Sequence, residues 1–311
     1  MRALIVTNMY PSAARPELGS FVRDQVQALR RTGAAEVELF AFAPGGAGAY
    51  VNGARELRRR HGRERYDIVH AHFGLTTWPA LAAHGKRRLV TLHGTDLADS
   101  RSRPITLAGL RLVDLVGVAS EQLAAQIPRW AASPGRRAVL PAGVDTARFK
   151  PLPRTQARTE LGLDPDGTYV LFAADPARPE KRFDRAREVA GDATLLTLGG
   201  IEPERVPLWV NAANAVLVPS EREGFGLATL EALACDVPVL ATPVGIAPEA
   251  LAGVQGTLCA PFDAATWTRA LAPHLAAEDP RIDGRTRASR FSTDAMAARV
   301  IDAWRQLLGH G

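Results

Sequence analysis

Residues 219–249 read PSEREGFGLATLEALACDVPVLATPVGIAPE, and the order of apolar runs and glycines in this segment indicates the fold class. The residues just before it, Ala215 to Val218, form an apolar run typical of a buried parallel strand. Strong helix formers follow from Leu227 to Ala234, and another apolar run begins at Pro238. This order of strand, loop, helix and strand predicts a loop at the carboxyl end of a parallel sheet, where open α/β proteins bind ligands.

The loop carries residues suited to a ligand. Gly224 and Gly226 let the backbone approach a bound group closely, and a helix that begins near Gly226 presents free N–H groups that suit a phosphate. Glu223 lies in the loop and Glu231 about one and a half turns into the helix, so they are expected to contact different parts of one ligand. The alternative is a surface loop followed by a solvated glutamate.

The pattern Glu-Gly-Phe-Gly-Leu-x-x-x-Glu-Ala at residues 223–232 resembles the signature of glycosyltransferase family 4, retaining enzymes of the GT-B fold. The resemblance implies an α/β protein with two Rossmann-like domains whose parallel sheets face each other across a cleft. It implies that Glu223 contacts the donor sugar and Glu231 the ribose hydroxyls. The neighbouring donor-binding residues would be Gly224, Phe225, Gly226 and Leu227. Nearly the whole chain resembles this family, most closely the type that assembles teichuronic acid and capsular polysaccharides.

Length and composition indicate an ordinary globular enzyme. A chain of 311 residues with 46% hydrophobic content can bury two cores, so two domains of about 150 residues each are expected. Cys235 and Cys259 stand in no Cys-x-x-Cys motif, which favours a reduced, cytoplasmic setting. The short apolar run after Met1 indicates a first strand, not a signal peptide, and no apolar stretch approaches the length of a membrane span.

Charge is uneven along the chain. Residues 1–150 carry 22 Lys+Arg and 12 Asp+Glu, a balance of +10, whereas residues 151–311 carry 16 and 21, a balance of −5, which together give the net +5. An Arg55–Arg65 cluster contributes six arginines, namely Arg55, Arg58, Arg59, Arg60, Arg63 and Arg65, and the sequence 86–88 adds three more cations. Such a surface predicts contact with an anionic membrane or an acidic acceptor, or it is simply a solvated helix. Nucleic acid is not expected, because no aromatic residues interleave the arginines.

The first 150 residues alternate apolar strands with helical patterns, which predicts a parallel sheet covered by helices on both faces. The resemblance implies that this is an acceptor-side Rossmann-like domain. Helices are expected near 21–31, 53–61 and 75–84. The expected strands are Leu4 to Thr7, Val37 to Phe42, Ile68 to Ala71, Leu89 to Leu92, Leu115 to Ala119 and Ala138 to Leu140.

Candidate site residues of this domain follow its strands. Gly19 precedes the first helix, where the resemblance implies a loop facing the donor diphosphate. Asp67, His70 and His72 match the family's Asp-x-x-His-x-His pattern; His70 is interpreted as a core histidine, and His72 is expected on the acceptor side.

The fourth strand ends at His93, which is followed by Gly94 and Asp96. The resemblance implies that His93 hydrogen-bonds a hydroxyl of the transferred sugar and that Asp96 lies beside the acceptor. A capping role for Asp96 is the alternative.

The linker Pro141-Ala-Gly-Val-Asp leads into a second, nucleotide-sugar-binding Rossmann-like domain at 151–292, and a helix at 293–311 is expected to cross back to the first domain. In the loop after the strand Tyr169 to Ala174, Lys181 matches the family's diphosphate-binding lysine. Arg178 lies near the usual arginine position, with Arg182 as the other candidate. Gly199 and Gly200 end the next strand and are expected beside the nucleobase.

The resulting hypothesis is a retaining glycosyltransferase that moves a sugar from a nucleotide diphosphate donor to a glycan or lipid-linked acceptor in cell-surface polysaccharide or glycolipid synthesis. Its expected catalytic residues are His93, Glu223, Lys181 and Arg178. No Asp-x-Asp motif is present, so cationic side chains and helix N-termini are expected to offset the diphosphate charge without a metal or other cofactor. A non-catalytic nucleotide-sugar or carbohydrate-binding protein and a nucleotide-sugar epimerase remain as alternatives.

Overall fold

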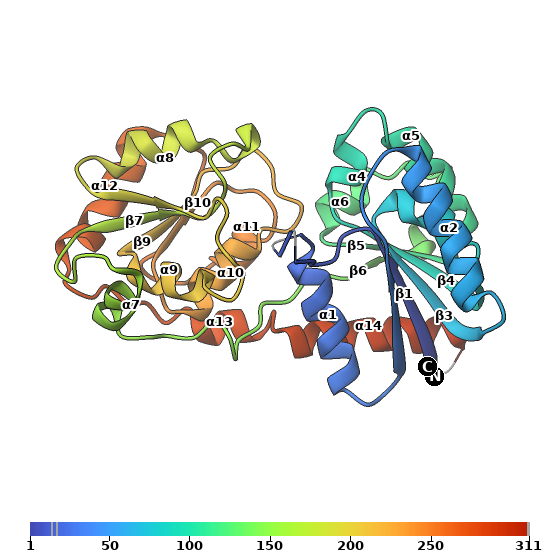
Figure 1. Cartoon of the computed structure of the whole chain (residues 1–311). Coiled ribbons are helices and arrows are strands. Elements are labelled where there is room, and N and C mark those ends of the chain that lie inside the picture. Colours follow the sequence, from blue (N-terminus) through green and yellow to red (C-terminus); the bar gives the residue numbers. More distant parts are fainter. Residues whose placement is uncertain (14, 17, 310–311) are drawn as a thin grey trace. The chain divides into compact units, whose positions relative to one another are not determined.

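The computed structural model describes residues 1–13, 15–16 and 18–309, and the chain divides into two compact units (Figure 1). The N-terminal unit comprises Met1–Gly143 with Thr293–Gly311, and the C-terminal unit comprises Val144–Ser292. Their boundary at Gly143 falls inside the expected linker, a few residues before the position 150 predicted from sequence. Residues 310 and 311 of the expected last segment lie outside the described residues.

The N-terminal unit is built on a six-stranded sheet in the order β2-β1-β3-β4-β5-β6, and each neighbouring pair is parallel. The strands are β1 (Arg2–Thr7), β2 (Glu36–Ala41), β3 (Arg65–His72), β4 (His84–Leu92), β5 (Leu115–Val118) and β6 (Arg137–Val139). The helices along this part of the chain are α1 (Ser20–Arg31), α2 (Ala47–His61), α3 (Thr77–Ala80), α4 (Thr95–Ala98), α5 (Arg103–Gly109) and α6 (Glu121–Ala125).

The last helix, α14 (Thr293–Leu308), belongs to the core of the N-terminal unit. Its buried positions include Met296, Val300 and Trp304, which recur at helical spacing and form one apolar stripe. This stripe shares a core cluster with Val26 of α1 and Ile5 of β1. The final helix therefore contributes to the folding of a sheet whose strands lie at the other end of the chain.

In this unit, the expected helix over 75–84 and the expected strand Leu89 to Leu92 differ from the observed structure. Instead of a helix over 75–84, the chain forms the 3₁₀ turn η1 (Gly74–Thr76), the single-turn helix α3 and then β4 from His84 onward. The first half of β4 is rich in charged residues, so its sequence does not predict a strand. In the structure it pairs with β3, beginning at Arg65. Gly85 fits there because an ideal Cβ on it would lie 2.6 Å from the Val69 side chain.

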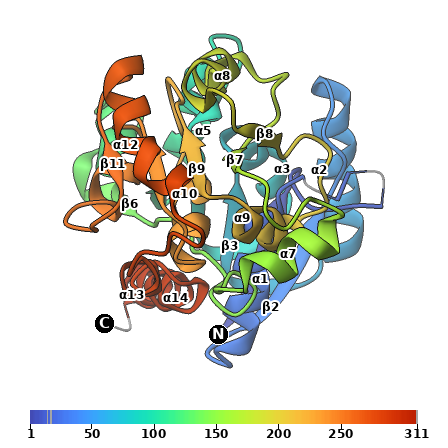
Figure 2. The ribbon, with the colours of Figure 1, turned by 90° about the vertical axis from the view of Figure 1, so that its left-hand side faces the viewer.

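The C-terminal unit repeats the architecture with five parallel strands in the order β11-β10-β9-β7-β8, part of which can be followed across Figure 2. The strands are β7 (Tyr169–Phe172), β8 (Thr194–Thr197), β9 (Ala215–Val218), β10 (Val239–Ala241) and β11 (Leu258–Cys259). The helices are α7 (Arg154–Leu161), α8 (Phe183–Ala190), α9 (Val206–Ala212), α10 (Leu227–Ala234), α11 (Ala247–Ala250), α12 (Ala264–Ala276) and α13 (Arg285–Ser289). The α/β class with two parallel sheets is thus confirmed.

Side chains from α8 and α12 pack on one face of this second sheet. Val189 of α8 and Trp267 of α12 share a core cluster with Phe172 and Leu217 of the strands. Burying side chains of this size stabilises the unit by about 1.5–3 kcal/mol each relative to exposure. Within the described residues, no helix is long and apolar enough to cross a membrane.

Candidate active site

The candidate donor site lies at the carboxyl edge of the second sheet, where the loops after β7 and β9 meet. The first loop contains the 3₁₀ turn η4 (Pro179–Lys181), and the second contains residues 219–226. The Glu221 N–H donates to the Glu180 carbonyl oxygen at 2.9 Å, which joins the two loops through their backbones. Side chains carried by these separate loops can therefore act on one ligand.

A shielded ion pair connects the two loops. The Lys181 ammonium group donates to both carboxylate oxygens of Glu223, at 2.7 and 2.6 Å, and the Ser220 hydroxyl donates to Glu223 Oε1 at 2.7 Å. The side chains of Lys181 and Glu223 are only 13% and 8% exposed. Shielding from water makes this attraction stronger than that of a surface pair, so each charge holds the other in place.

Two glycines shape the backbone around Glu223. Gly226 adopts a φ of 94° at the start of α10, and Gly245 adopts a φ of 58° in the loop after β10. An ideal Cβ on Gly245 would lie 2.4 Å from the Phe225 carbonyl oxygen, so only glycine allows this approach. Gly245 and Ser220 are not among the residues expected from the sequence. Gly245 and Glu249 form a Gly-x-x-x-Glu pattern that could have indicated Gly245, whereas no pattern marks Ser220.

The remaining expected donor residues occupy the same edge. Gly199 and Gly200 follow β8, and Gly200 has a φ of 71°. Leu227 begins α10, and Glu231 is partly exposed on the next turn of that helix. Sequence reasoning therefore places these residues on the correct elements, while their contacts with a donor stay a prediction.

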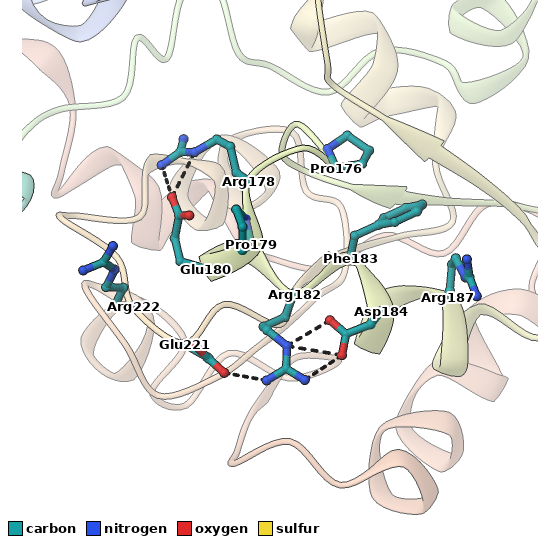
Figure 3. Close-up of a pocket in the computed structure, with 10 residues that line it drawn as sticks. All are labelled: Pro176, Arg178, Pro179, Glu180, Arg182, Phe183, Asp184, Arg187, Glu221 and Arg222. Atoms are coloured by element: carbon teal, nitrogen blue, oxygen red, sulfur yellow. Dashed lines mark hydrogen bonds and ion pairs between the residues drawn. The ribbon is translucent and has the colours of Figure 1, made fainter.

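The two arginine candidates extend to different sides of the segment between them (Figure 3). Arg178 is 52% exposed and donates to Glu180 Oε1 at 2.7 Å. Arg182 pairs with both Asp184 and Glu221, and these hydrogen bonds raise its pKa. The Lys181 N–H donates to the Arg178 carbonyl oxygen at 3.0 Å, but within the described residues neither guanidinium group is hydrogen-bonded to the side chain of Lys181 or Glu223. The choice between the two arginines is therefore left to experiment.

Both arginines line an open cavity of about 960 Å³ whose lining does not include Lys181 or Glu223. Size alone is a weak guide here, because this cavity is a broad surface hollow. The shielded pair and the left-handed glycines are the stronger signs of a ligand site.

In the N-terminal unit, three histidine rings stack in a row at the carboxyl ends of β3 and β4. The ring centroids of His70 and His72 lie 4.6 Å apart, and those of His72 and His93 lie 5.3 Å apart. His70 and His72 are fully buried and His93 is partly exposed. His70 thus matches its interpretation as a core histidine, whereas His72 lies beneath the surface and reaches a ligand only through His93.

Burial keeps all three imidazoles neutral. It lowers the pKa of His72 to about 3, and it also lowers the pKa values of His70 and His93. The neighbouring imidazoles lower the pKa values of His70 and His93 further, because adjacent protonated rings would repel each other. A neutral His93 can donate one hydrogen bond and accept another.

The contact between His72 and His93 assigns the tautomer of each ring. His72 Nδ1 lies 3.1 Å from His93 Nε2, while His72 Nε2 is buried without a partner. A buried N–H group without an acceptor destabilises the folded state more than a buried ring nitrogen whose lone pair is unused. The His72 proton therefore belongs on Nδ1, which donates to His93 Nε2. Neutral His93 then carries its proton on Nδ1. This arrangement makes His93 a hydrogen-bond donor toward a ligand and not a general base at Nε2.

Asp96 joins the loops that follow β3 and β4. Its two oxygens accept the backbone N–H groups of Gly74 and His93, both at 2.6 Å, and the residue is 7% exposed. Burial raises the pKa of Asp96 although these donors oppose the shift. The capping role of Asp96 is therefore present in the structure, and its place beside the acceptor stays a prediction.

Gly19 stands at the start of α1 with a φ of 68°. An ideal Cβ there would lie 2.2 Å from the Met9 carbonyl oxygen. This glycine is thus required for the close approach of the loop after β1 to α1, whatever ligand lies nearby.

The two halves of the chain match two family descriptions. "Glycosyltransferase Family 4" matches residues 4–148, and "Glycosyl transferases group 1" matches residues 164–290. A protein of Mycolicibacterium gilvum named D-inositol 3-phosphate glycosyltransferase is 30% identical over 312 residues, covering 85% of this chain and 70% of the relative. The protein of the same name from Mycobacterium avium is also 30% identical, covering 84% and 74%.

Solved structures show the same fold at low identity. Sucrose-phosphate synthase from Thermosynechococcus elongatus superimposes with a TM-score of 0.75 at 22% identity, covering 100% of both chains. Anabaena HepE in complex with UDP-glucose gives 0.71 at 17% identity, covering 98% of this chain and 100% of that one. The expected GT-B fold is confirmed, whereas these names give no support to the teichuronic acid type, which stays a prediction.

The three buried imidazoles should make the protein less stable on mild acidification. Unfolded histidines take up a proton near pH 6.5, but folded His70, His72 and His93 do not. Stability is therefore complete above that pH and falls below it, by up to about 1.4 kcal/mol per pH unit for each histidine. Guanidinium denaturation between about pH 7 and pH 5.5 measures this slope, because most carboxylates titrate below that window.

The exposed His84 supplies the control for this experiment. His84→Gln should leave the slope unchanged. A free energy of unfolding that does not vary across this pH range would show that the imidazoles are not buried in neutral form.

The Lys181–Glu223 pair should show strong energetic coupling. Each of Lys181→Met and Glu223→Gln leaves the other side chain partly buried without its main partner, whereas the double variant removes both charges. A double-mutant cycle on unfolding free energies should give a coupling of about 1–3 kcal/mol.

The exposed pair Arg178–Glu180 is the matched control and should give a smaller coupling. Equal couplings for the two pairs would contradict the special position of Lys181 and Glu223.

Proposed function

The chain belongs to the group 1 glycosyltransferases, and from this premise we propose that it transfers a sugar from a nucleotide diphosphate donor to a hydroxyl group with retention of anomeric configuration. The single observation that carries the proposal is the shielded contact between Lys181 and Glu223 beside the N-terminus of α10. It brings a cation, a sugar-binding carboxylate and free helix N–H groups to one sheet edge.

Each part has a proposed role. The helix N-terminus at Gly226 and the ammonium group of Lys181 bind the diphosphate, and they stabilise the negative charge that grows as the glycosidic bond breaks. Two of the three Lys181 N–H groups are directed at Glu223, which leaves one for a phosphate oxygen. Glu223 accepts hydrogen bonds from the sugar, Glu231 binds the ribose, and Gly199 and Gly200 flank the base. His93 donates from Nδ1 to a sugar hydroxyl, and the leaving phosphate takes the acceptor proton.

We propose uridine diphosphate sugars as the first donors to test, because HepE is described in complex with UDP-glucose. The acceptor classes are a glycan or lipid-linked sugar of the cell surface and, from the names of the relatives, an inositol phosphate. An anionic membrane is a further proposed partner of the N-terminal unit. Its support here is the net charge of residues 1–150.

A cytoplasmic setting is also proposed. Cys235 and Cys259 are both free thiols, and burial raises the pKa of Cys235 to about 12, which keeps it protonated and unreactive.

The experiment that tests the function combines a nucleotide sugar, an acceptor and EDTA, with nucleotide release and product linkage measured by NMR. We expect transfer with retained configuration that persists in EDTA, because protein cations offset the diphosphate charge. Inverted product, or activity that returns only with Mg²⁺ or Mn²⁺, would contradict the mechanism. Donor binding without turnover would identify a binding protein, and conversion of the donor alone would identify an epimerase.

The arginine of the diphosphate site can be identified by kinetics. Lys181→Ala should lower kcat more than it raises the donor KM, with a total loss of about a hundredfold, because its charge matters most in the transition state. The arginine that acts with Lys181 should show the same pattern on replacement by alanine, and Arg178 is our first candidate.

Arg187→Ala is the control, since this exposed residue lines the same cavity. A near-normal kcat for Arg178→Ala together with a strongly reduced kcat for Arg182→Ala would assign the role to Arg182. Normal rates for the alanine variants of Lys181, Arg178 and Arg182 would show that the diphosphate does not bind at this loop.

A further inference from the structure

An apolar surface around α5 is exposed in the N-terminal unit. Four large hydrophobic side chains of this region are open to solvent: Trp78 at 39%, Ile105 at 51%, Leu112 at 45% and Trp130 at 61%. In the described part of the C-terminal unit, no large hydrophobic residue is exposed to this degree. We call this surface, made by these four residues, the α5 face; α5 can be located in Figure 1.

The helix α5 and the 3₁₀ turn η2 (Leu110–Leu112) carry apolar residues on the side that is buried and also on the side that faces solvent. Leu107 and Leu110 are buried against the unit, whereas Ile105, Ala108 and Leu112 are exposed. At about 100° per residue, the exposed residues fall on one stripe opposite the buried ones. A surface helix of a globular protein normally turns polar residues outward, so this outer stripe indicates a partner.

A tryptophan flanks the helix on each side. The Trp78 indole N–H donates to the Ile105 carbonyl oxygen at 3.3 Å, which holds that ring along α5. On the other side, Trp130 and Arg103 line a cavity of about 670 Å³ that also includes Leu107. Tryptophan has an apolar body and one polar group, a combination enriched at the interface between lipid and water.

Three arginines lie in the same segments as these apolar residues: Arg103 at the start of α5, Arg111 in η2 and Arg129 next to Trp130. Arg103, Arg111 and Arg129 are exposed, and none forms an ion pair within residues 1–13, 15–16 and 18–309. In the Arg55–Arg65 cluster, Arg59 and Arg60 pair with Glu56, whereas the other four arginines are likewise exposed without an ion pair among the described residues; the cluster differs from the α5 face in lacking exposed large apolar side chains among its own residues. The cations around the α5 face are thus available to an external anion. They also disfavour a second copy of the chain as partner, because a two-fold interface would bring the same positive charges together.

We propose that the α5 face docks on the surface of an anionic lipid bilayer. The exposed tryptophans, Ile105 and Leu112 enter the headgroup region, while Arg103, Arg111 and Arg129 contact lipid phosphates. This is the arrangement of interfacial segments in general, where apolar insertion and cationic attraction act together.

The α5 face lies at the carboxyl edge of the first sheet. Trp78 follows the carboxyl end of β3, and α5 follows the carboxyl end of β4. The α5 face therefore lies at the same edge of the sheet as His72, His93 and Asp96. The Arg55–Arg65 cluster instead flanks the amino end of β3 at Arg65. If the proposed transfer reaction is correct, docking presents the acceptor side of the enzyme to a lipid-linked acceptor.

Vesicle flotation tests the docking without turnover. Vesicles of phosphatidylcholine alone and of phosphatidylcholine with phosphatidylglycerol are compared. The wild-type protein should float only with the anionic vesicles. Arg103→Gln with Arg129→Gln should weaken binding about tenfold or more, and Ile105→Ser with Trp130→Ser should reduce it similarly.

The matched control is Arg58→Gln with Arg59→Gln in the Arg55–Arg65 cluster, which should retain binding. Lipids with brominated acyl chains should quench the fluorescence of Trp78 and Trp130 in a Trp209→Phe background, since Trp209 is partly exposed whereas Trp267 and Trp304 are fully buried. Circular dichroism and a thermal shift with UDP-glucose establish that each variant is folded and that its donor site is intact, which separates failed docking from a failed donor assignment.

Three results would overturn the proposal. The first is no binding of the wild-type protein to anionic vesicles, and the second is binding that is lost in the Arg58/Arg59 control but kept in the α5 variants. The third is a dimer, measured by sedimentation velocity, that Ile105→Ser dissociates; this would assign the face to a second copy of the chain.

Discussion

The ion pair between Lys181 and Glu223 is the contact on which the candidate donor site depends. It joins loops that leave different strands, and the Ser220 hydroxyl adds a third hydrogen bond to the same carboxylate. Gly245 supplies the left-handed backbone that lets the loop after β10 approach Phe225, and Gly226 opens α10 beside the ion pair. The site is therefore preorganised by polar contacts at the edge of an apolar sheet, and a diphosphate would meet a cation already held in position.

Much of this arrangement follows from the sequence, because its signals are local. The apolar run from Ala215 to Val218, the glycine loop and the helix after Gly226 fall on β9, its loop and α10. Likewise, the stripe of Met296, Val300 and Trp304 marks a helix with one buried face. Patterns of period two and 3.6 identify such elements regardless of what they later contact.

Other features depend on contacts between distant residues, which no local pattern encodes. The charged start of β4 is a strand only because β3 pairs with it. His72 is buried because His93 stacks above it, and Asp96 serves as a cap because the N–H groups of two loops converge on it. The pairing of Lys181 with Glu223 belongs to the same class: each residue is recognisable as a candidate, but their contact follows from the three-dimensional fold.

In the proposed function, the loops at the carboxyl edge of the second sheet hold the nucleotide sugar. Hydrogen–deuterium exchange with and without UDP-glucose measures this binding, because backbone N–H groups at the start of α10 would bind the diphosphate. Slower exchange is expected in peptides that cover residues 199–201 and 224–231. Protection confined to the hollow around Arg182 and Arg187, or no protection by any nucleotide sugar, would contradict it.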